Sequence, residues 1–148
     1  MFAEDSVEID APPQLVWEVF TDVERWPQWT ASVTSLVGLE GPGLAVGRRF
    51  AIKQPGMQKL VWQVTEIDAG SSWTWVQRSP GVNVVARHYV SARPDGGTFV
   101  RQQLDQGGAL GALVGRLMVK KTKRFLELEA QGLKARSEQL SRADGPHA

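Results

Sequence analysis

Cysteine is absent from this chain of 148 residues, and histidine occurs only twice. Without thiols the protein can form no disulfide bond, thiolate metal site or cysteine nucleophile. His88 is the one histidine outside the C-terminal tail, so a metal site would depend on carboxylates alone, and no loop has the spacing of a calcium site. We therefore expect no metal and no other cofactor.

Long apolar runs and a strong net charge are also missing. No stretch is apolar enough over its length to cross a bilayer, so stable membrane insertion is not expected. The opening residues Met1–Asp5 are acidic and lack the basic-then-apolar order of a signal peptide. The net charge is only +1, and nucleic acid is not an expected partner. These features favour a cytoplasmic protein, and they predict no particular oligomeric state.

The amino-terminal residues predict one strand and two short helices. Ser6–Asp10 alternates polar and apolar side chains, as a half-buried strand does. The Pro12-Pro13 pair ends that strand and suits the first turn of a helix. A second short helix is expected to begin at the Thr21-Asp22 pair, and Trp26-Pro27 should stop it. The apolar residues of the first helix recur at helical spacing: Leu15, Val16, Val19 and Phe20.

Glycine and proline recur at short intervals between residues 38 and 97, and β-rich runs lie between them. This alternation predicts an antiparallel meander joined by hairpins. The clearest turn is Pro94–Gly97, in which proline fixes φ and glycine is free to take a positive φ. The six expected strands are Ser32–Leu39, Arg48–Lys53, Gln58–Asp68, Ser72–Arg78, Val82–Arg93 and Thr98–Gln106.

A helical pattern follows residues 106–108 and continues to about Leu140. A helix of roughly 30 residues is about 45 Å long, so it must lie across the sheet. One strand, two helices, six strands and one long helix are typical of an α+β domain with its helices on one face of an antiparallel sheet. We place this single domain at residues 1–140 and expect residues 141–148 to be a disordered tail.

Four short motifs open the chain: Ile9–Pro12, Val16-Trp17, Asp22 and Trp26–Trp29. Further motifs follow at Gly47, Trp62–Glu66, Trp73–Trp75 and Pro94–Thr98. With these motifs and the long helix, residues 3–138 resemble the SRPBCC superfamily, which includes START, Bet v 1-like and polyketide cyclase/dehydrase-related proteins. The resemblance implies a helix-grip fold, in which a curved seven-stranded sheet wraps the C-terminal helix and leaves a cavity. Members bind lipids, sterols, aromatic polyketides or hormones in that cavity, and some are enzymes.

The tryptophans of the predicted sheet suggest an aromatic wall. Trp73 and Trp75 have the same parity, so both should point to one face of their strand, and Trp62 lies on the preceding strand. On the inner face of a curved sheet, such rings would line a cavity for an apolar or ring-bearing ligand. Plain core packing is the alternative, and the sequence favours neither.

His88 has Ala86 and Val90 on its face of the strand, so it should point inward. Its ordinary pKa makes it the natural general acid or base near neutral pH. A core histidine that is hydrogen-bonded to the backbone is the alternative. Arg87 and Tyr89 have the opposite parity and should face the other side of the sheet.

Two features of the long helix leave alternatives open. Small residues between Gly108 and Gly115 would allow close packing against the sheet or leave free volume for a ligand. Lys120–Arg124 holds four cations, which would form a solvated face or contact an anionic partner. Lys121 could lean inward on its apolar stem and pair with a ligand carboxylate.

These observations support three hypotheses. The first is a protein that binds an apolar small molecule, lipid-like or aromatic polyketide-like, in an internal cavity. The second is an aromatic polyketide cyclase/dehydrase-like enzyme with His88 as general acid or base. The third is a protein-interaction or stress-response module that uses the basic helix face. The residues expected around the ligand are Trp26 and Trp29 at the mouth, Trp62, Trp75 and His88 on the sheet, and Leu113, Leu117 and Met118 on the helix.

Overall fold

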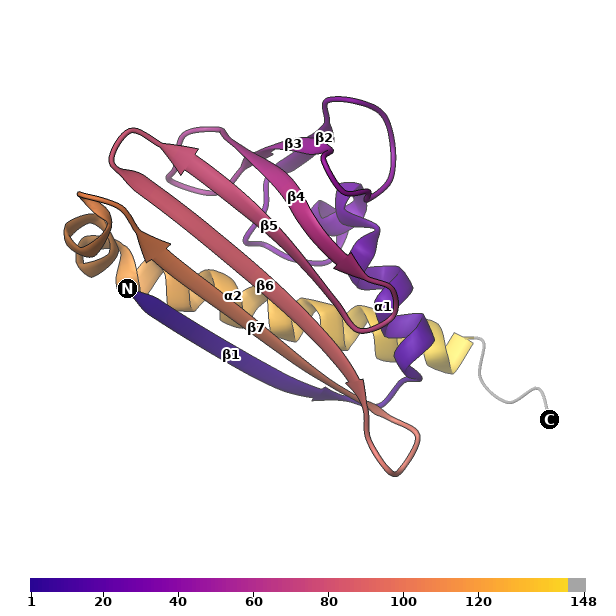
Figure 1. The fold of residues 1–148 in the computed structure, drawn as a ribbon. Coiled ribbons are helices and arrows are strands. Elements are labelled where there is room, and N and C mark those ends of the chain that lie inside the picture. The colour runs from indigo at the N-terminus through magenta and orange to yellow at the C-terminus, as the bar shows by residue number, and fades with distance from the viewer. Residues whose placement is uncertain (144–148) are drawn as a thin grey trace.

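The computed structural model describes residues 1–143, which form a seven-stranded antiparallel sheet and three helical segments. The strand order is β1-β7-β6-β5-β4-β3-β2, so six consecutive strands form a meander and the first strand joins its last member (Figure 1). The strands are β1 (Phe2–Ile9), β2 (Ser35–Gly38), β3 (Arg49–Lys53), β4 (Leu60–Asp68), β5 (Ser72–Ser79), β6 (Val82–Ala92) and β7 (Thr98–Gly107). The helical segments are α1 (Pro13–Thr21), the 3-10 helix η1 (Val23–Gln28) and α2 (Gly111–Ala143).

Helix α2 lies across one face of the sheet, and α1 lies on the same side near its C-terminal end (Figure 1). Two hydrogen bonds attach the C-terminal half of α2 to the end of β1. Lys134 Nζ donates to the carbonyl oxygen of Glu8 at 3.1 Å, and the amide of Asp10 donates to Glu138 Oε2 at 2.8 Å. The α+β helix-grip fold, a seven-stranded antiparallel sheet wrapping one long helix, is therefore confirmed.

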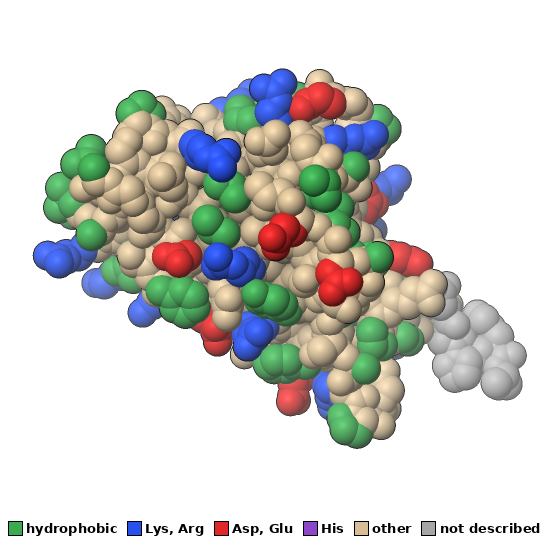
Figure 2. All heavy atoms as spheres, viewed as in Figure 1, with side chains coloured by type: hydrophobic (Ala, Val, Ile, Leu, Met, Phe, Trp, Pro, Cys, Tyr) green, Lys and Arg blue, Asp and Glu red, His purple; other side chains and the backbone are tan. Residues whose placement is uncertain are grey.

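Alternation along the strands gives the sheet a buried inner face and a partly exposed outer face. Along β6, Ala86, His88 and Val90 are buried, whereas the residues between them are partly exposed. On the outer face the guanidinium of Arg101 lies 4.7 Å from the centre of the Tyr89 ring. Cations and anions are interspersed over this face (Figure 2). The predicted inward direction of His88 and outward direction of Tyr89 are both confirmed.

The first strand is longer than its side-chain pattern predicts. Alternation predicts Ser6–Asp10, but β1 pairs with β7 from Phe2 opposite Asp105 to Ile9 opposite Thr98. Main-chain hydrogen bonds hold an antiparallel pair together whether or not the side chains alternate. A pattern of side chains alone therefore underestimates this edge strand.

The ends of η1 and α2 in the structure also differ from those predicted from the sequence. Trp26-Pro27 does not stop the second helix, because η1 continues to Gln28 with the proline inside it, and the fixed φ of proline fits this conformation. Helix α2 continues to Ala143, three residues beyond the expected end of the domain. The remainder of the predicted tail, residues 144–148, lies outside the described residues.

Small residues near the start of α2 allow close packing. A methyl group at Gly115 would lie 2.5 Å from Cβ of Met1, and one at Gly108 would lie 2.6 Å from the carbonyl oxygen of Gly81. Both distances are shorter than real Cβ contacts. Of the two alternatives, close packing is therefore the correct one at these positions.

Candidate ligand-binding site

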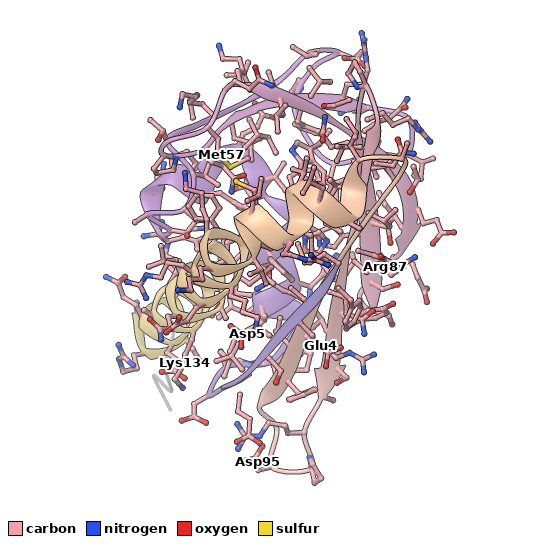
Figure 3. The ribbon with its side chains drawn as sticks, turned by 90° about the vertical axis from the view of Figure 1, so that its left-hand side faces the viewer. Glu4, Asp5, Met57, Arg87, Asp95 and Lys134 are labelled. Carbon is pink, nitrogen blue, oxygen red and sulfur yellow. The ribbon has the colours of Figure 1, made fainter. Side chains whose placement is uncertain are left out.

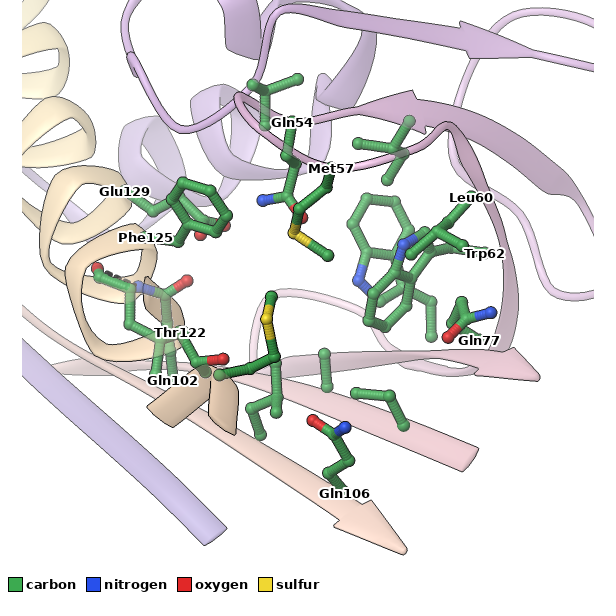
Figure 4. A pocket seen from close by; sticks show the side chains of 18 of the residues that line it. Gln54, Met57, Leu60, Trp62, Gln77, Gln102, Gln106, Thr122, Phe125 and Glu129 are labelled. Carbon is green, nitrogen blue, oxygen red and sulfur yellow. Dashed lines mark hydrogen bonds between the residues drawn. The ribbon is translucent and has the colours of Figure 1, made fainter. Parts of the chain in front are cut away.

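A cavity of about 420 Å³ lies between the inner face of the sheet and α2. Strands β3 to β7, the β3–β4 loop, η1 and α2 all contribute to its walls (Figure 4). This volume falls within the range of small-molecule pockets, about 300–1,000 Å³. The site is therefore a product of the whole fold, since its walls come from segments far apart in the sequence.

Tryptophans form the wall of the cavity on the sheet side. The ring centres of Trp62 and Trp75 are 5.8 Å apart, and both rings line the cavity. Trp73 meets Trp75 edge to face at 4.8 Å, but it lies completely buried against Phe20 and does not reach the cavity. Trp73 and Trp75 point to the same face of β5, as predicted. Of the two predicted roles, Trp75 lines the cavity and Trp73 packs in the core.

The two tryptophans expected at the mouth lie elsewhere. Trp26 is buried, stacks on Phe20 with ring centres 5.8 Å apart, and donates its Nε1–H to the Phe20 carbonyl oxygen at 2.9 Å. It belongs to the inner wall of the cavity. Trp29 packs against Trp26 but borders a separate surface hollow that Arg136 and Leu140 also line. The mouth position is wrong for both residues, because η1 turns their rings toward the core and toward α2.

On the helix side, two of the three residues expected to line the cavity do not line it. Leu113 and Leu117 are 57% and 76% exposed, so their predicted place in the cavity is wrong. The residues after them, Val114 and Met118, line the cavity instead, about 100° further around the helix. The predicted position of Met118 on this wall agrees with the structure. The cavity face of α2 consists of Val114, Met118, Thr122, Phe125, Leu126 and Glu129.

The cavity lining is rich in side-chain amides and poor in charge. Among the lining residues in the described part of the chain, none is lysine or arginine, and only His88 and Glu129 titrate. A ligand would thus meet aromatic rings, uncharged amides and one acidic group. The lining glutamines are Gln54, Gln58, Gln77, Gln102 and Gln106, whereas Gln103 borders the cavity but donates its amide to Glu4 on the other side of the sheet.

Glu129 is the buried acid of this site. It lies one turn beyond Phe125 on α2 and is only 8% exposed. Burial raises the pKa of Glu129 to about 8, because the charged form loses its hydration and no cation within residues 1–143 compensates for that loss. Near neutral pH the carboxyl group is therefore mostly protonated, and it can donate as well as accept a hydrogen bond.

Gln102 on β7 lies in the same part of the cavity as Glu129 and Thr122 (Figure 4). Its Nε2 donates to the carbonyl oxygen of Leu126 at 3.3 Å and joins the sheet to α2. Its Oε1 is buried and has no hydrogen-bond partner in the described part of the chain. An unpaired buried acceptor costs about 1–3 kcal/mol, so this oxygen marks a place that a donor from a ligand would suit.

His88 is held as an uncharged residue. Its ring stacks on Trp73 with centres 3.7 Å apart, and its Nδ1 lies 3.0 Å from the Trp73 carbonyl oxygen. Burial lowers the pKa of His88 to about 3. A carbonyl oxygen can only accept, so Nδ1 carries the proton and Nε2 is left as an acceptor. The backbone hydrogen bond agrees with the core-histidine alternative, and a pKa this low does not suit acid–base chemistry near neutral pH.

The basic segment of α2 contacts the β3–β4 loop through one residue. Lys121 Nζ donates to the carbonyl oxygen of Gly56 at 3.3 Å, and the side chain does not line the cavity. Its Nζ is therefore engaged by the loop, and pairing with a ligand carboxylate stays a prediction. In the same loop, Met57 points its side chain toward α2 (Figure 3). Use of residues 120–124 as a surface for another molecule stays a prediction.

Metal-ligating clusters and long apolar helices are both missing from residues 1–143. Within that range, histidine and acidic side chains do not gather in groups of three or more that could hold a metal ion. Nor does any helix of that range combine the length and the apolar character needed to cross a membrane.

A sheet that grips one long helix and encloses a cavity against it defines the chain as a helix-grip protein. Residues 3–138 match the family model described as polyketide cyclase / dehydrase and lipid transport, and the chain belongs to this family. The predicted SRPBCC relationship is confirmed. A search of curated proteins finds no match.

Solved structures show the same fold at low sequence identity. The Zhui aromatase/cyclase from Streptomyces sp. R1128 has a TM-score of 0.79 and 18% identity, covering 98% of this chain and 98% of its own. A protein from Nitrosospira multiformis has a TM-score of 0.77 and 18% identity, covering 96% and 99%. A hypothetical protein from Helicobacter pylori has a TM-score of 0.79 and 15% identity, covering 93% and 88%.

The sequence prediction did not include Glu129 or Gln102. One signal was available for Glu129: it lies in phase with Met118, Thr122 and Phe125 on a single face of the helix. A prediction based only on apolar residues selects Leu113 and Leu117 and omits Glu129. For Gln102, alternation along its strand gives only the inward direction, and the cavity around its amide becomes visible only in the fold.

Proposed function

We propose that the protein binds an apolar small molecule, lipid-like or aromatic polyketide-like, in the cavity between the sheet and α2. The observation that supports this function is the aromatic-walled space of about 420 Å³ between the sheet and α2. Protein interiors are otherwise packed almost without voids larger than water. Membership of a family described by polyketide cyclisation, dehydration and lipid transport is consistent with such a ligand.

The bound molecule would place its apolar body against Trp62, Trp75 and Met118, which come from two strands and the helix. Trp26 and His88 would complete the inner wall. The exposed residues Leu113 and Leu117, and Trp29 on its separate hollow, are outside the proposed contacts.

The proposal predicts that phenylnaphthylamine, a neutral fluorophore, binds the purified protein and gains fluorescence. Val84→Trp should weaken this binding at least tenfold, because Val84 lines the cavity and the larger side chain occupies its volume. Fluorescence titration measures both dissociation constants, and circular dichroism establishes that the variant is folded.

Val85→Trp is the matched control, since Val85 is the next residue of β6 and has the opposite parity. It should leave the dissociation constant of the fluorophore within about twofold, because the same bulk is added to the outer face. Equal weakening by both substitutions, or no binding by the unsubstituted protein, would contradict the proposed function.

A cyclase or dehydrase activity is the second candidate, favoured by the likeness to an aromatase/cyclase and by one buried acid. A pKa of about 8 suits Glu129 to acid–base catalysis, whereas the pKa of about 3 does not suit His88. If a polyketide substrate is turned over, Glu129→Gln should reduce kcat at least 100-fold and His88→Gln much less. The reverse order, measured by product formation, would restore His88 as the acid–base group.

A further inference from the structure

One end of the cavity differs from the rest and indicates the chemistry of the ligand, on the condition that the proposed binding function holds. Figure 4 shows Glu129, Gln102 and Thr122 grouped on one side, and Trp62 with Leu60 on the opposite side. The first group contains the one acidic residue of the described lining, whereas the second side combines rings with an uncharged amide. A ligand with an apolar body and one charged group would therefore place that group beside Glu129.

The side of the cavity that contains Glu129 also contains a buried acceptor that lacks a donor. Gln102 Oε1 is buried without a partner, although the amide nitrogen of the same side chain is fixed on Leu126. The carboxyl group of Glu129 is also buried, and it has neither a salt bridge nor a hydrogen bond to another residue in the described part of the chain. Buried polar groups are nearly always paired in folded proteins, so the unpaired Gln102 Oε1 indicates a missing donor in this part of the cavity.

The charges of the cavity lining indicate which kind of donor group a ligand would carry. An anionic ligand would meet an acid and no lysine or arginine among the described residues of the lining. A hydroxyl group can donate to Gln102 Oε1 and accept from a protonated Glu129, but it carries no charge to pair with the ionised carboxylate. An ammonium group has three donors and a charge opposite to that of an ionised carboxylate. The ring of Phe125, beside Glu129 in Figure 4, supplies a further surface that attracts cations.

We propose that the cavity selects an organic amine with an apolar or aromatic body, whose ammonium group pairs with the Glu129 carboxylate and donates to Gln102 Oε1. Binding then removes the proton of the Glu129 carboxyl group, which passes to the solvent. The paired charges are complementary, and the apolar body lies against the tryptophan wall. Glu129 thus determines which charge type the cavity accepts.

Three probes with the same ring and different polar ends test this selection: naphthylmethylamine, naphthylmethanol and naphthoic acid. Calorimetric titration near neutral pH should give the order amine, alcohol, acid from tightest to weakest. Glu129→Gln should weaken the amine by roughly 10- to 100-fold, the value of a hydrogen bond to a charged partner. The same substitution should leave the alcohol within about threefold and should not weaken the acid.

Glu127→Gln is the matched control, because it makes the same chemical change two residues away at an exposed position. It should leave all three affinities unchanged. A second readout needs no variant. Titration of the amine in buffers with different ionisation enthalpies should show the release of about one proton per ligand, and titration of the alcohol should show none.

The outcomes distinguish failure of the binding function from failure of this inference alone. If no probe binds, including the neutral fluorophore, the binding function and this inference both fail. If the probes bind but the amine is not preferred, or if Glu129→Gln leaves its affinity unchanged, the inference alone is overturned. Tight amine binding without proton release, measured below the pKa of Glu129 in the empty protein, also overturns it, because the ammonium group would then not be paired with an ionised Glu129.

Discussion

Replacing Gly132 by alanine is expected to lower the melting temperature by roughly 4–8 °C. A methyl group at this position of α2 would overlap the carbonyl oxygen of Trp29 and would lie 3.1 Å from its carbonyl carbon. The obstacle is backbone, which cannot turn aside as a side chain can. Overpacking of this kind costs about 3 kcal/mol, more than the ~1 kcal/mol that alanine gains over glycine in a helix. Thermal and urea unfolding both measure the net loss of about 2 kcal/mol.

Gly107→Ala is the control for this prediction. Gly107 lies at the end of β7, and an added methyl group would meet nothing within 4 Å. Its effect should stay within about 0.5 kcal/mol. A Gly132→Ala variant as stable as the parent would mean that α2 does not approach η1 as closely as the structure shows.

The fold could be predicted because its signals are local and repeated. Alternation along β6 fixes the inward direction of His88, and the Pro94–Gly97 sequence marks the turn between the last two strands. Both signals come from neighbouring residues in the sequence, and neither depends on which segment packs against them. The end of η1 could not be placed in the same way, because Pro27 is tolerated inside a 3-10 helix and does not stop it.

The candidate site depended on information that one element does not contain. A helix with apolar residues on more than half of its circumference can turn either Leu113 and Leu117 or Val114 and Met118 toward the sheet. The close packing of Gly115 on Met1 agrees with the second rotation, and it joins residues that are far apart in the sequence. The leucines are exposed as a consequence, and the face that contains Glu129 borders the cavity.

Glu129→Gln is expected to stabilise the protein near neutral pH, by an amount that increases with pH. The pKa of Glu129 is raised from 4.5 to about 8 by burial, so the folded protein keeps a proton that the unfolded chain releases. Stability therefore falls as the pH rises between these two values. Each pKa unit corresponds to ~1.4 kcal/mol, which gives a loss of about 3 kcal/mol by neutral pH. Glutamine has the same size and no such charge, so the variant should not show this loss.

Urea unfolding of both proteins at a series of pH values from about 5 to 9 isolates this contribution, since every other titrating group is common to the two. The difference in unfolding free energy should be small at the acidic end and reach several kcal/mol at the basic end. Glu127→Gln, at its exposed position, should produce a difference of about 0.5 kcal/mol or less that does not grow with pH. Parallel curves for the unsubstituted protein and the Glu129→Gln variant would contradict the raised pKa.

The same measurement connects stability to the proposed ligand class. A carboxyl group that destabilises the empty fold at neutral pH, where an amide of equal size would not, is explained if a bound cation compensates for it. Saturating naphthylmethylamine should then remove most of the loss of stability with pH in the unsubstituted protein, because the ammonium group stabilises the ionised carboxylate. Naphthylmethanol should raise stability without changing the slope, since it binds the cavity but carries no charge. If both probes change the dependence of unfolding free energy on pH equally, the raised pKa of Glu129 does not determine which ligands the cavity prefers.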